Sequence, residues 1–142
     1  MKGVKFDTFQ TMKYYRSGVL GSFVPENFNH PEEAHEYFVK KFLKQVDVID
    51  ILDPDKDKLL ARIMNNSSEA VRPTFQEKLI YHGSKLSGVR LKITWYKSTA
   101  SLTQKQFNQY INDVIVFGET ELGIEVQDSK EWKKNNATLG KK

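Results

Sequence analysis

Residues 89–97, with the sequence VRLKITWYK, carry the strongest strand signal in the chain. Apolar side chains occupy every second position, at Val89, Leu91, Ile93 and Trp95. Because successive side chains of a strand point to opposite faces of a sheet, this alternation predicts a strand with one buried face. The second face meets either solvent or a phosphate backbone, and it consists of Arg90, Lys92, Thr94 and Tyr96.

Three segments are predicted to be helices. One runs over residues 8–23. A second begins near Pro31, which suits a first helical turn, and ends among the lysines of residues 40–44. The third begins with a capping box, in which Thr103 is followed three positions later by Gln106.

The remaining segments complete a prediction of the fold class. The stretch VDVIDIL at residues 46–52 predicts a second strand, and DPDKD after it predicts a turn. Within residues 57–82, KLLARIM and FQEKLIYHG each fit a strand or a helix. We therefore expect a single α+β domain, with two or three main helices packed on a small antiparallel sheet. This domain is placed at residues 1–128, before a basic tail at residues 129–142.

Composition excludes several classes of protein. The 142 residues contain no cysteine, which removes disulfides, thiolate metal sites and cysteine nucleophiles. No apolar run approaches the roughly 20 residues that a membrane span needs. These features predict a cytoplasmic protein with no membrane partner. The net charge at pH 7 is +4, and an acidic block at residues 113–128 lies between basic flanks.

Two segments carry motifs of a known family. One contains Ser98, Thr99 and Leu102, followed by Phe107, Tyr110, Phe117 and Gly123-Ile124. The other is the predicted helix EEAHEYFVKKFL, which has an acidic first turn and a His-Glu pair. On these motifs the chain resembles the recombination proteins of bacteriophages related to the lambda Orf (NinB) recombination mediator. The similarity covers most of residues 8–128, without residues 46–90.

The resemblance implies an accessory (mediator) protein that binds single-stranded DNA in phage homologous recombination or replication. It also implies a homodimer, contact with the host single-strand-binding protein, and help in loading a phage recombinase. It implies no cofactor, and we expect no enzymatic activity. The expected location is the cytoplasm of the bacterial host.

Seven residues are candidates for contact with nucleic acid. Binding without sequence preference needs cations along the backbone and rings on which bases stack. The predicted strand supplies Arg90, Lys92, Tyr96 and Lys97, and the first helix supplies Lys13, Tyr14 and Arg16. We expect these side chains to converge on one open groove. The alternative is that the cations are ordinary solvated residues and that the tyrosines pack in the core.

The two tryptophans are assigned to structural roles. Trp95 falls on the apolar face of the predicted strand, which places it in the core. Trp132 lies near the end of the chain, between lysines. For Trp132 we favour anchoring of the tail over stacking on a base, because a terminal segment stays ordered only when it is attached to the body.

Neither the hydroxyl nor the imidazole side chains form a motif of catalysis or metal binding. Ser98 and Thr99 lack a Gly-x-Ser-x-Gly elbow, so we expect them to satisfy backbone groups where a strand meets a helix. The histidines have none of the spacings of a metal site, and they are His30, His35 and His82.

The acidic residues permit two further interpretations. Asp53, Asp55 and Asp57 alternate, but Lys58 stands where a calcium loop needs glycine, which favours a turn. A metal-dependent nuclease would use carboxylates such as Asp47, Asp50 and Asp53. The acidic block at residues 113–128 would repel phosphates, and it serves either a dimer or helper-protein contact or simply solvation. A structural or interaction protein of a phage or mobile element, with no nucleic-acid binding, is the remaining alternative.

Overall fold

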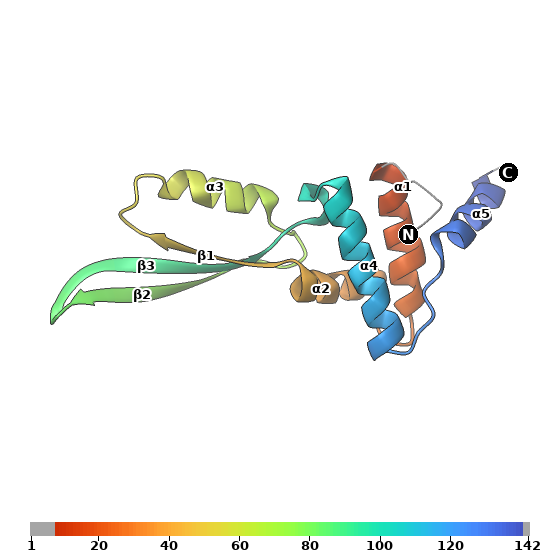
Figure 1. The fold of residues 1–142 in the computed structure, drawn as a ribbon, viewed down its shortest axis with the longest axis horizontal. Coiled ribbons are helices and arrows are strands. Elements are labelled where there is room, and N and C mark those ends of the chain that lie inside the picture. The colour runs from red at the N-terminus through yellow and green to blue at the C-terminus, as the bar shows by residue number, and fades with distance from the viewer. Residues whose placement is uncertain (1–7, 141–142) are drawn as a thin grey trace. The chain divides into compact units, whose positions relative to one another are not determined.

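The computed structural model describes the backbone of residues 8–140 and the side chains of residues 10–134. The fold belongs to the α+β class, as predicted, with helices and one three-stranded antiparallel sheet (Figure 1). Its contacts group into two compact units. The helical unit extends up to Phe38 and resumes at Thr103, and the sheet unit is Val39–Leu102.

The first helix of the helical unit follows the predicted range but changes type twice. It is α-helical over Thr8–Lys13 (α1), π-helical over Tyr14–Val19 and 3₁₀-helical over Leu20–Phe23. Tyr14 and Tyr15 are both buried in it. The ring of Tyr14 packs on Trp132 of α5 (Ser129–Gly140), while Tyr15 packs on α4 (Gln104–Glu121). The helix is therefore buried on two sides, which gives it a wider apolar face than a single stripe.

The two other predicted helices are present, and each begins as its sequence indicates. α2 spans Pro31–Phe42, with two glutamates in its first turn. α4 begins with the predicted capping box: the Gln106 N–H donates to Thr103 Oγ1 at 3.1 Å, and the Thr103 N–H donates to Gln106 Oε1 at 2.9 Å. These two bonds satisfy backbone donors that a helix start otherwise leaves unpaired.

Two glycines shape the end of α4. The helix runs through Gly118, where the ring of Phe23 lies against the backbone. A Cβ at this position would lie 2.6 Å from Cζ of Phe23, so only glycine permits this close packing. Gly123 has a φ of +64°, which glycine adopts without strain, and the Ile124 N–H donates back to the Gly118 carbonyl at 3.1 Å. The chain then continues to α5, where the Trp132 indole is buried.

The sheet unit contains three antiparallel strands in the order β1-β3-β2. The predicted strand at residues 89–97 is the central one, β3 (Lys85–Tyr96). The prediction at residues 46–52 corresponds to β1 (Lys44–Asp50). The stretch that the sequence left ambiguous contains a helix, α3 (Lys56–Asn66), and an edge strand, β2 (Thr74–His82).

One face of the sheet is covered by α3, which gives this unit its own core. That core consists of Ile49, Ile63, Ile93 and Trp95. Trp95 therefore has the buried position that alternation predicted, and its indole N–H donates to Oδ2 of Asp47 at 2.7 Å. Residues that face each other in register share a face of the sheet, so the pairing Lys92 with Val48 identifies the opposite, open face.

No helix within the described residues has the length and apolarity required to cross a membrane.

Candidate nucleic-acid interface

The open face of the sheet unit is built by the register of its three strands. From β3 it receives Tyr96, Thr94, Lys92 and Arg90. The partners of these residues in β1 are Lys44, Val46, Val48 and Asp50. The partners in β2 are Thr74, Gln76 and Lys78. This set, which we call the sheet-face site, brings residues from three separate segments onto one surface.

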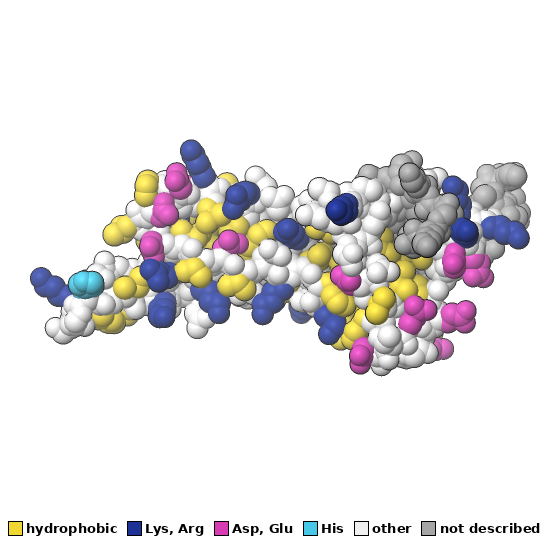
Figure 2. Space-filling view, in the orientation of Figure 1, with side chains coloured by type: hydrophobic (Ala, Val, Ile, Leu, Met, Phe, Trp, Pro, Cys, Tyr) yellow, Lys and Arg dark blue, Asp and Glu magenta, His cyan; other side chains and the backbone are white. Residues whose placement is uncertain are grey.

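The charge of the sheet-face site is positive. Lys44, Lys78 and Lys92 are exposed, and within the described part of the chain no carboxylate forms an ion pair with any of them. The single carboxylate of the site is Asp50, which accepts from Nε of Arg90 at 2.9 Å. In Figure 2, Lys and Arg side chains line the side of the sheet unit away from α3, and the acidic side chains visible in this unit lie on the α3 side. The site therefore attracts anions.

Apolar and aromatic groups lie among these cations. Val46 and Val48 are 50% and 57% exposed, although valine is usually buried. Tyr96 is half-buried at one end of the site, next to its partner Lys44. A surface that combines spaced cations, an aromatic ring and exposed apolar side chains has the chemical character of a single-stranded nucleic-acid platform.

The structure assembles three of the four strand residues expected to bind nucleic acid. Arg90, Lys92 and Tyr96 share the sheet-face site. Lys97 does not continue this row, because it comes one residue after Tyr96 and alternation turns it to the opposite side. Lys97 instead forms an isolated bridge with Ser67, and its N–H donates to the Leu43 carbonyl at 3.0 Å.

The three candidates from the first helix belong to the helical unit. Lys13 is exposed there. The expectation that Tyr14 presents its ring to a base is wrong, because Tyr14 is 1% exposed. Its hydroxyl donates to the Gln127 carbonyl at 2.7 Å, and burial raises its pKa to about 12, with Asp128 and Glu119 contributing.

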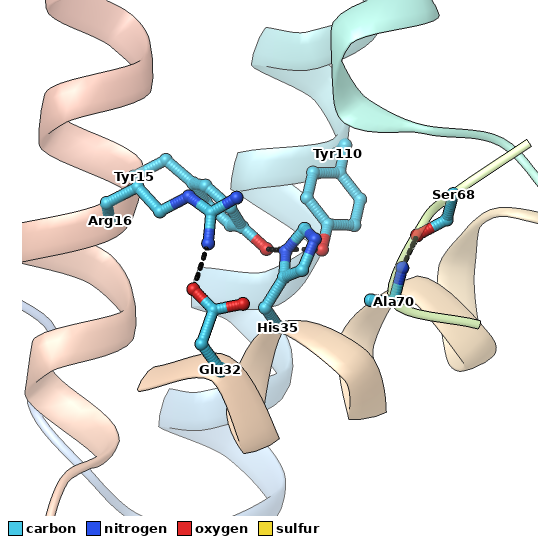
Figure 3. Close-up of polar contacts among 7 residues, drawn as sticks. All are labelled: Tyr15, Arg16, Glu32, His35, Ser68, Ala70 and Tyr110. Atoms are coloured by element: carbon cyan, nitrogen blue, oxygen red, sulfur yellow. Dashed lines mark hydrogen bonds and ion pairs between the residues drawn. The ribbon is translucent and has the colours of Figure 1, made fainter. Parts of the chain in front are cut away.

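Arg16 is half-buried and forms an ion pair with Glu32 of α2 (Figure 3). The Arg16 guanidinium is thus paired with a carboxylate of the helical unit, to which Arg16 itself belongs. Lys13 and Arg16 lie in a different unit from the sheet-face site, and their convergence with it on one groove stays a prediction.

Sequence reasoning missed the members of the sheet-face site that come from β1 and β2, among them Lys44, Val46, Val48 and Lys78. A signal was present for β1, since KQVDVID alternates in the same way as β3. For β2, both faces are largely exposed, so its sequence has no apolar alternation that distinguishes a strand from a helix.

A buried polar cluster lies in the helical unit (Figure 3). The Tyr15 hydroxyl lies 2.7 Å from Nδ1 of His35 and 2.7 Å from the Tyr110 hydroxyl. Burial lowers the pKa of His35 to about 4, and the positive charge of Arg16 acts in the same direction. Burial also raises the pKa values of both tyrosines. All three groups are therefore neutral near pH 7, and their hydrogen bonds to one another stabilise the interior.

The carboxylates that a nuclease would need have structural partners. Asp47 accepts from Trp95, and Asp50 accepts from Arg90. Asp53 Oδ1 accepts from the Asp55 N–H at 2.8 Å, which confirms the predicted turn before α3. Across the described residues, no group of three or more His, Asp or Glu side chains is arranged to hold a metal ion.

Three other interpretations of the sequence concern Ser98, Trp132 and the acidic block. Ser98 Oγ accepts from the Ser101 N–H at 3.2 Å, so it satisfies a backbone group between β3 and α4, as predicted. The Trp132 indole donates to Ser17 Oγ at 2.6 Å and is 6% exposed, which confirms that it anchors α5. The role of the acidic block at residues 113–128 stays a prediction.

Comparison of the chain with protein-family models, curated proteins and solved structures gives no match. The relation to phage recombination mediators, and the partners that it implies, therefore remain predictions from the sequence motifs.

Proposed function

We propose that the protein binds single-stranded DNA on its sheet-face site, largely without sequence preference. The observation that carries this proposal is the grouping of Lys44, Lys78 and Lys92 on one exposed sheet face whose single carboxylate is paired with Arg90. Cations at this spacing neutralise phosphates and release counterions, which is the main source of non-specific affinity for nucleic acid.

The single-stranded form is favoured by the other side chains of the site. A duplex offers phosphates along its outer surface but keeps its bases stacked inside. A single strand also exposes base faces, which stack on an aromatic ring such as Tyr96 and cover apolar groups such as Val46 and Val48. The mixed character of the sheet-face site therefore fits a single strand better than the outside of a duplex.

The biological setting rests on the sequence resemblance. We place the protein as an accessory factor of phage homologous recombination or replication, processes in which single-stranded DNA is exposed. A homodimer, the host single-strand-binding protein and a phage recombinase are the partners that belong to this setting, in the cytoplasm of the bacterial host. The acidic block at residues 113–128 is the surface that we assign to a protein contact.

The proposal is tested by fluorescence anisotropy of a labelled single-stranded oligonucleotide at low and moderate salt. If about three phosphates are neutralised, the logarithm of the association constant falls with the logarithm of salt with a slope of about −2. Lys92→Ala and Arg90→Ala should each weaken binding to every sequence alike. Lys78→Glu with Lys92→Glu should weaken it at least about tenfold.

A matched control tests whether the loss of affinity depends on where the charge is changed or only on the change in net charge. Lys58 and Arg62 are exposed on α3, which covers the other face of the sheet. Lys58→Glu with Arg62→Glu makes the same change in net charge and should alter affinity by less than about twofold. Equal losses in the two double variants, or binding that does not depend on salt, would refute the sheet-face site.

A further inference from the structure

The hairpin of β2 and β3 extends past the rest of the sheet. The last register pair between β1 and β3 is Asp50 with Arg90. One further backbone bond follows, from the Ile51 N–H to the Val89 carbonyl at 3.0 Å, and the chain then turns towards α3. Residues 79–89, which we call the ribbon, thus continue as two strands beyond the last register pair of β1 and beyond α3 (Figure 1).

The ribbon exposes apolar side chains that no part of its own unit covers. Leu79, Tyr81 and Leu86 are each at least half exposed. A register shift between Ile80 and Tyr81 interrupts the ladder, so that Tyr81 pairs with Leu86 near the tip. An isolated two-stranded ribbon is marginally stable in water, and exposed apolar groups of this kind are typical of a surface that meets a partner.

The charge of the ribbon identifies the class of that partner. Residues 79–89 have the sequence LIYHGSKLSGV, which contains Lys85 but no aspartate or glutamate, and Lys78 of the sheet-face site lies where the ribbon joins the sheet. Lys85 lies at the tip, in the register pair with His82. A ribbon with a basic tip and no acidic side chain along either strand is complementary to a polyanion.

The geometry distinguishes a duplex groove from a single strand. A single strand that lies on the sheet-face site covers one side of a ribbon and leaves the other side in water. The ribbon has exposed side chains on both strands and both sides, so an occupant that surrounds it can contact all of them. The major groove of B-form DNA is about 12 Å wide and accepts a two-stranded β-ribbon between phosphates on either side.

We propose that the ribbon inserts into the groove of a DNA duplex that adjoins the single strand. The preferred substrate is then a junction between single-stranded and double-stranded DNA, such as a tailed duplex. This inference rests on the proposed function, because it takes the sheet-face site as the place of the single strand. It adds a second binding element, centred on Tyr81, Lys85 and Leu86, that lies outside the sheet-face site.

The test compares three labelled DNAs by anisotropy: a single strand, a blunt duplex and a duplex with a single-stranded tail. The unaltered protein should bind the tailed duplex about tenfold more tightly than the single strand. The ribbon variant Tyr81→Thr, Lys85→Thr, Leu86→Thr keeps residues that favour strands. It should lose this preference while its affinity for the single strand stays within about twofold.

A second variant, Lys85→Glu, changes one exposed side chain at the tip and should also reduce the preference. Circular dichroism and the molecular mass in solution are recorded for each protein. The inference is overturned if the tailed duplex binds no more tightly than the single strand, or if the ribbon variant keeps the preference. It is also overturned if the ribbon variant has a different oligomeric state from the unaltered protein, because the ribbon then joins copies of the chain. If the unaltered protein binds none of the three DNAs, the proposed function itself is refuted.

Discussion

The hydroxyl of Tyr15 lies 2.7 Å from Nδ1 of His35 in the interior of the helical unit. Both side chains are buried, and the same hydroxyl meets the hydroxyl of Tyr110 at 2.7 Å. Burial first, and then the charge of Arg16, lower the pKa of His35 from 6.5 to about 4, against an opposing effect of Glu32. The folded state therefore depends on a neutral imidazole at this position.

The pH dependence of stability follows from the lowered pKa of His35. Between pH 4 and 6.5 the unfolded chain binds a proton that the folded chain excludes, so the free energy of unfolding rises with pH in this window. The contribution is complete above pH 6.5 and is lost as the pH falls towards 4, by up to about 3 kcal/mol. Urea unfolding between these limits measures it.

His35→Gln removes this titration and should give a flatter stability profile. Its control is His82→Gln, which alters an exposed histidine of the sheet unit and should leave the slope unchanged. The carboxylates are the same in all three proteins, so the difference between profiles isolates His35. Identical slopes for the unaltered protein and His35→Gln would contradict this account.

Tyr15→Phe should destabilise the protein by about 2 to 3 kcal/mol. The reason is that one hydroxyl serves both His35 and Tyr110, so its removal leaves a buried imidazole nitrogen without this partner. Tyr37→Phe is the matched control, because Tyr37 is exposed on α2 and should cost less than about 0.5 kcal/mol. Chemical denaturation at pH 7 measures the free energy of unfolding of both variants. Equal losses would show that the hydrogen bonds of the buried cluster do not stabilise the protein.

Gly118→Ala should be destabilising, although alanine favours a helix over glycine by about 1 kcal/mol. The added Cβ would lie 2.6 Å from Cζ and 2.8 Å from Cε1 of Phe23, whose ring is buried. Forcing that ring aside costs about 1 to 3 kcal/mol. Gly21→Ala, where a Cβ meets nothing within 4 Å, should be neutral in the same thermal unfolding experiment.

Trp132→Ala should release α5 from the rest of the helical unit. Its indole donates to Ser17 Oγ at 2.6 Å and its ring lies 5.6 Å from that of Tyr14. Limited trypsin digestion measures the release as faster cleavage after Lys130. Glu125→Ala, at an exposed position away from the cleaved bond, should keep the original cleavage rate. Unchanged cleavage in Trp132→Ala would mean that α5 is held by other contacts.

Tyr96→Leu should weaken binding of single-stranded DNA by about 1 to 3 kcal/mol, the range found for the stacking of one base. Tyr96→Phe keeps the ring and should bind nearly as well as the unaltered protein. Anisotropy at one low salt concentration compares the two variants. If the leucine and phenylalanine variants bind equally, the site attaches DNA by charge alone and the stacking part of the proposal fails.

Much of the local structure was predictable because its causes lie within a few residues of one another. The capping box joins Thr103 and Gln106, which are three positions apart. The turn before α3 uses the side chain of Asp53 to bind the backbone of Asp55. The burial of Trp95 follows from the alternation of its own strand.

The wrong expectation for Tyr14 has the opposite origin. Its neighbours in sequence give no reason to bury it, and a helix with one apolar stripe would leave it exposed. Trp132, more than a hundred positions later, packs against it and turns a second side of the helix inward. No local pattern reports a contact between segments so far apart.

The sequence by itself determined the helices that begin near Thr8, Pro31 and Thr103, the strands β1 and β3, and the apolar side of β3, because periodicity and capping act over one or two turns of chain. It left α3 and β2 open, since neither stretch has a periodicity that separates a helix from a strand. Only the tertiary structure decided which cations share a surface. Lys44, Lys78 and Lys92 come from three strands, and strand order and register place them on one face. Register depends on long-range pairing and on the packing of α3, so it is set when the sheet assembles.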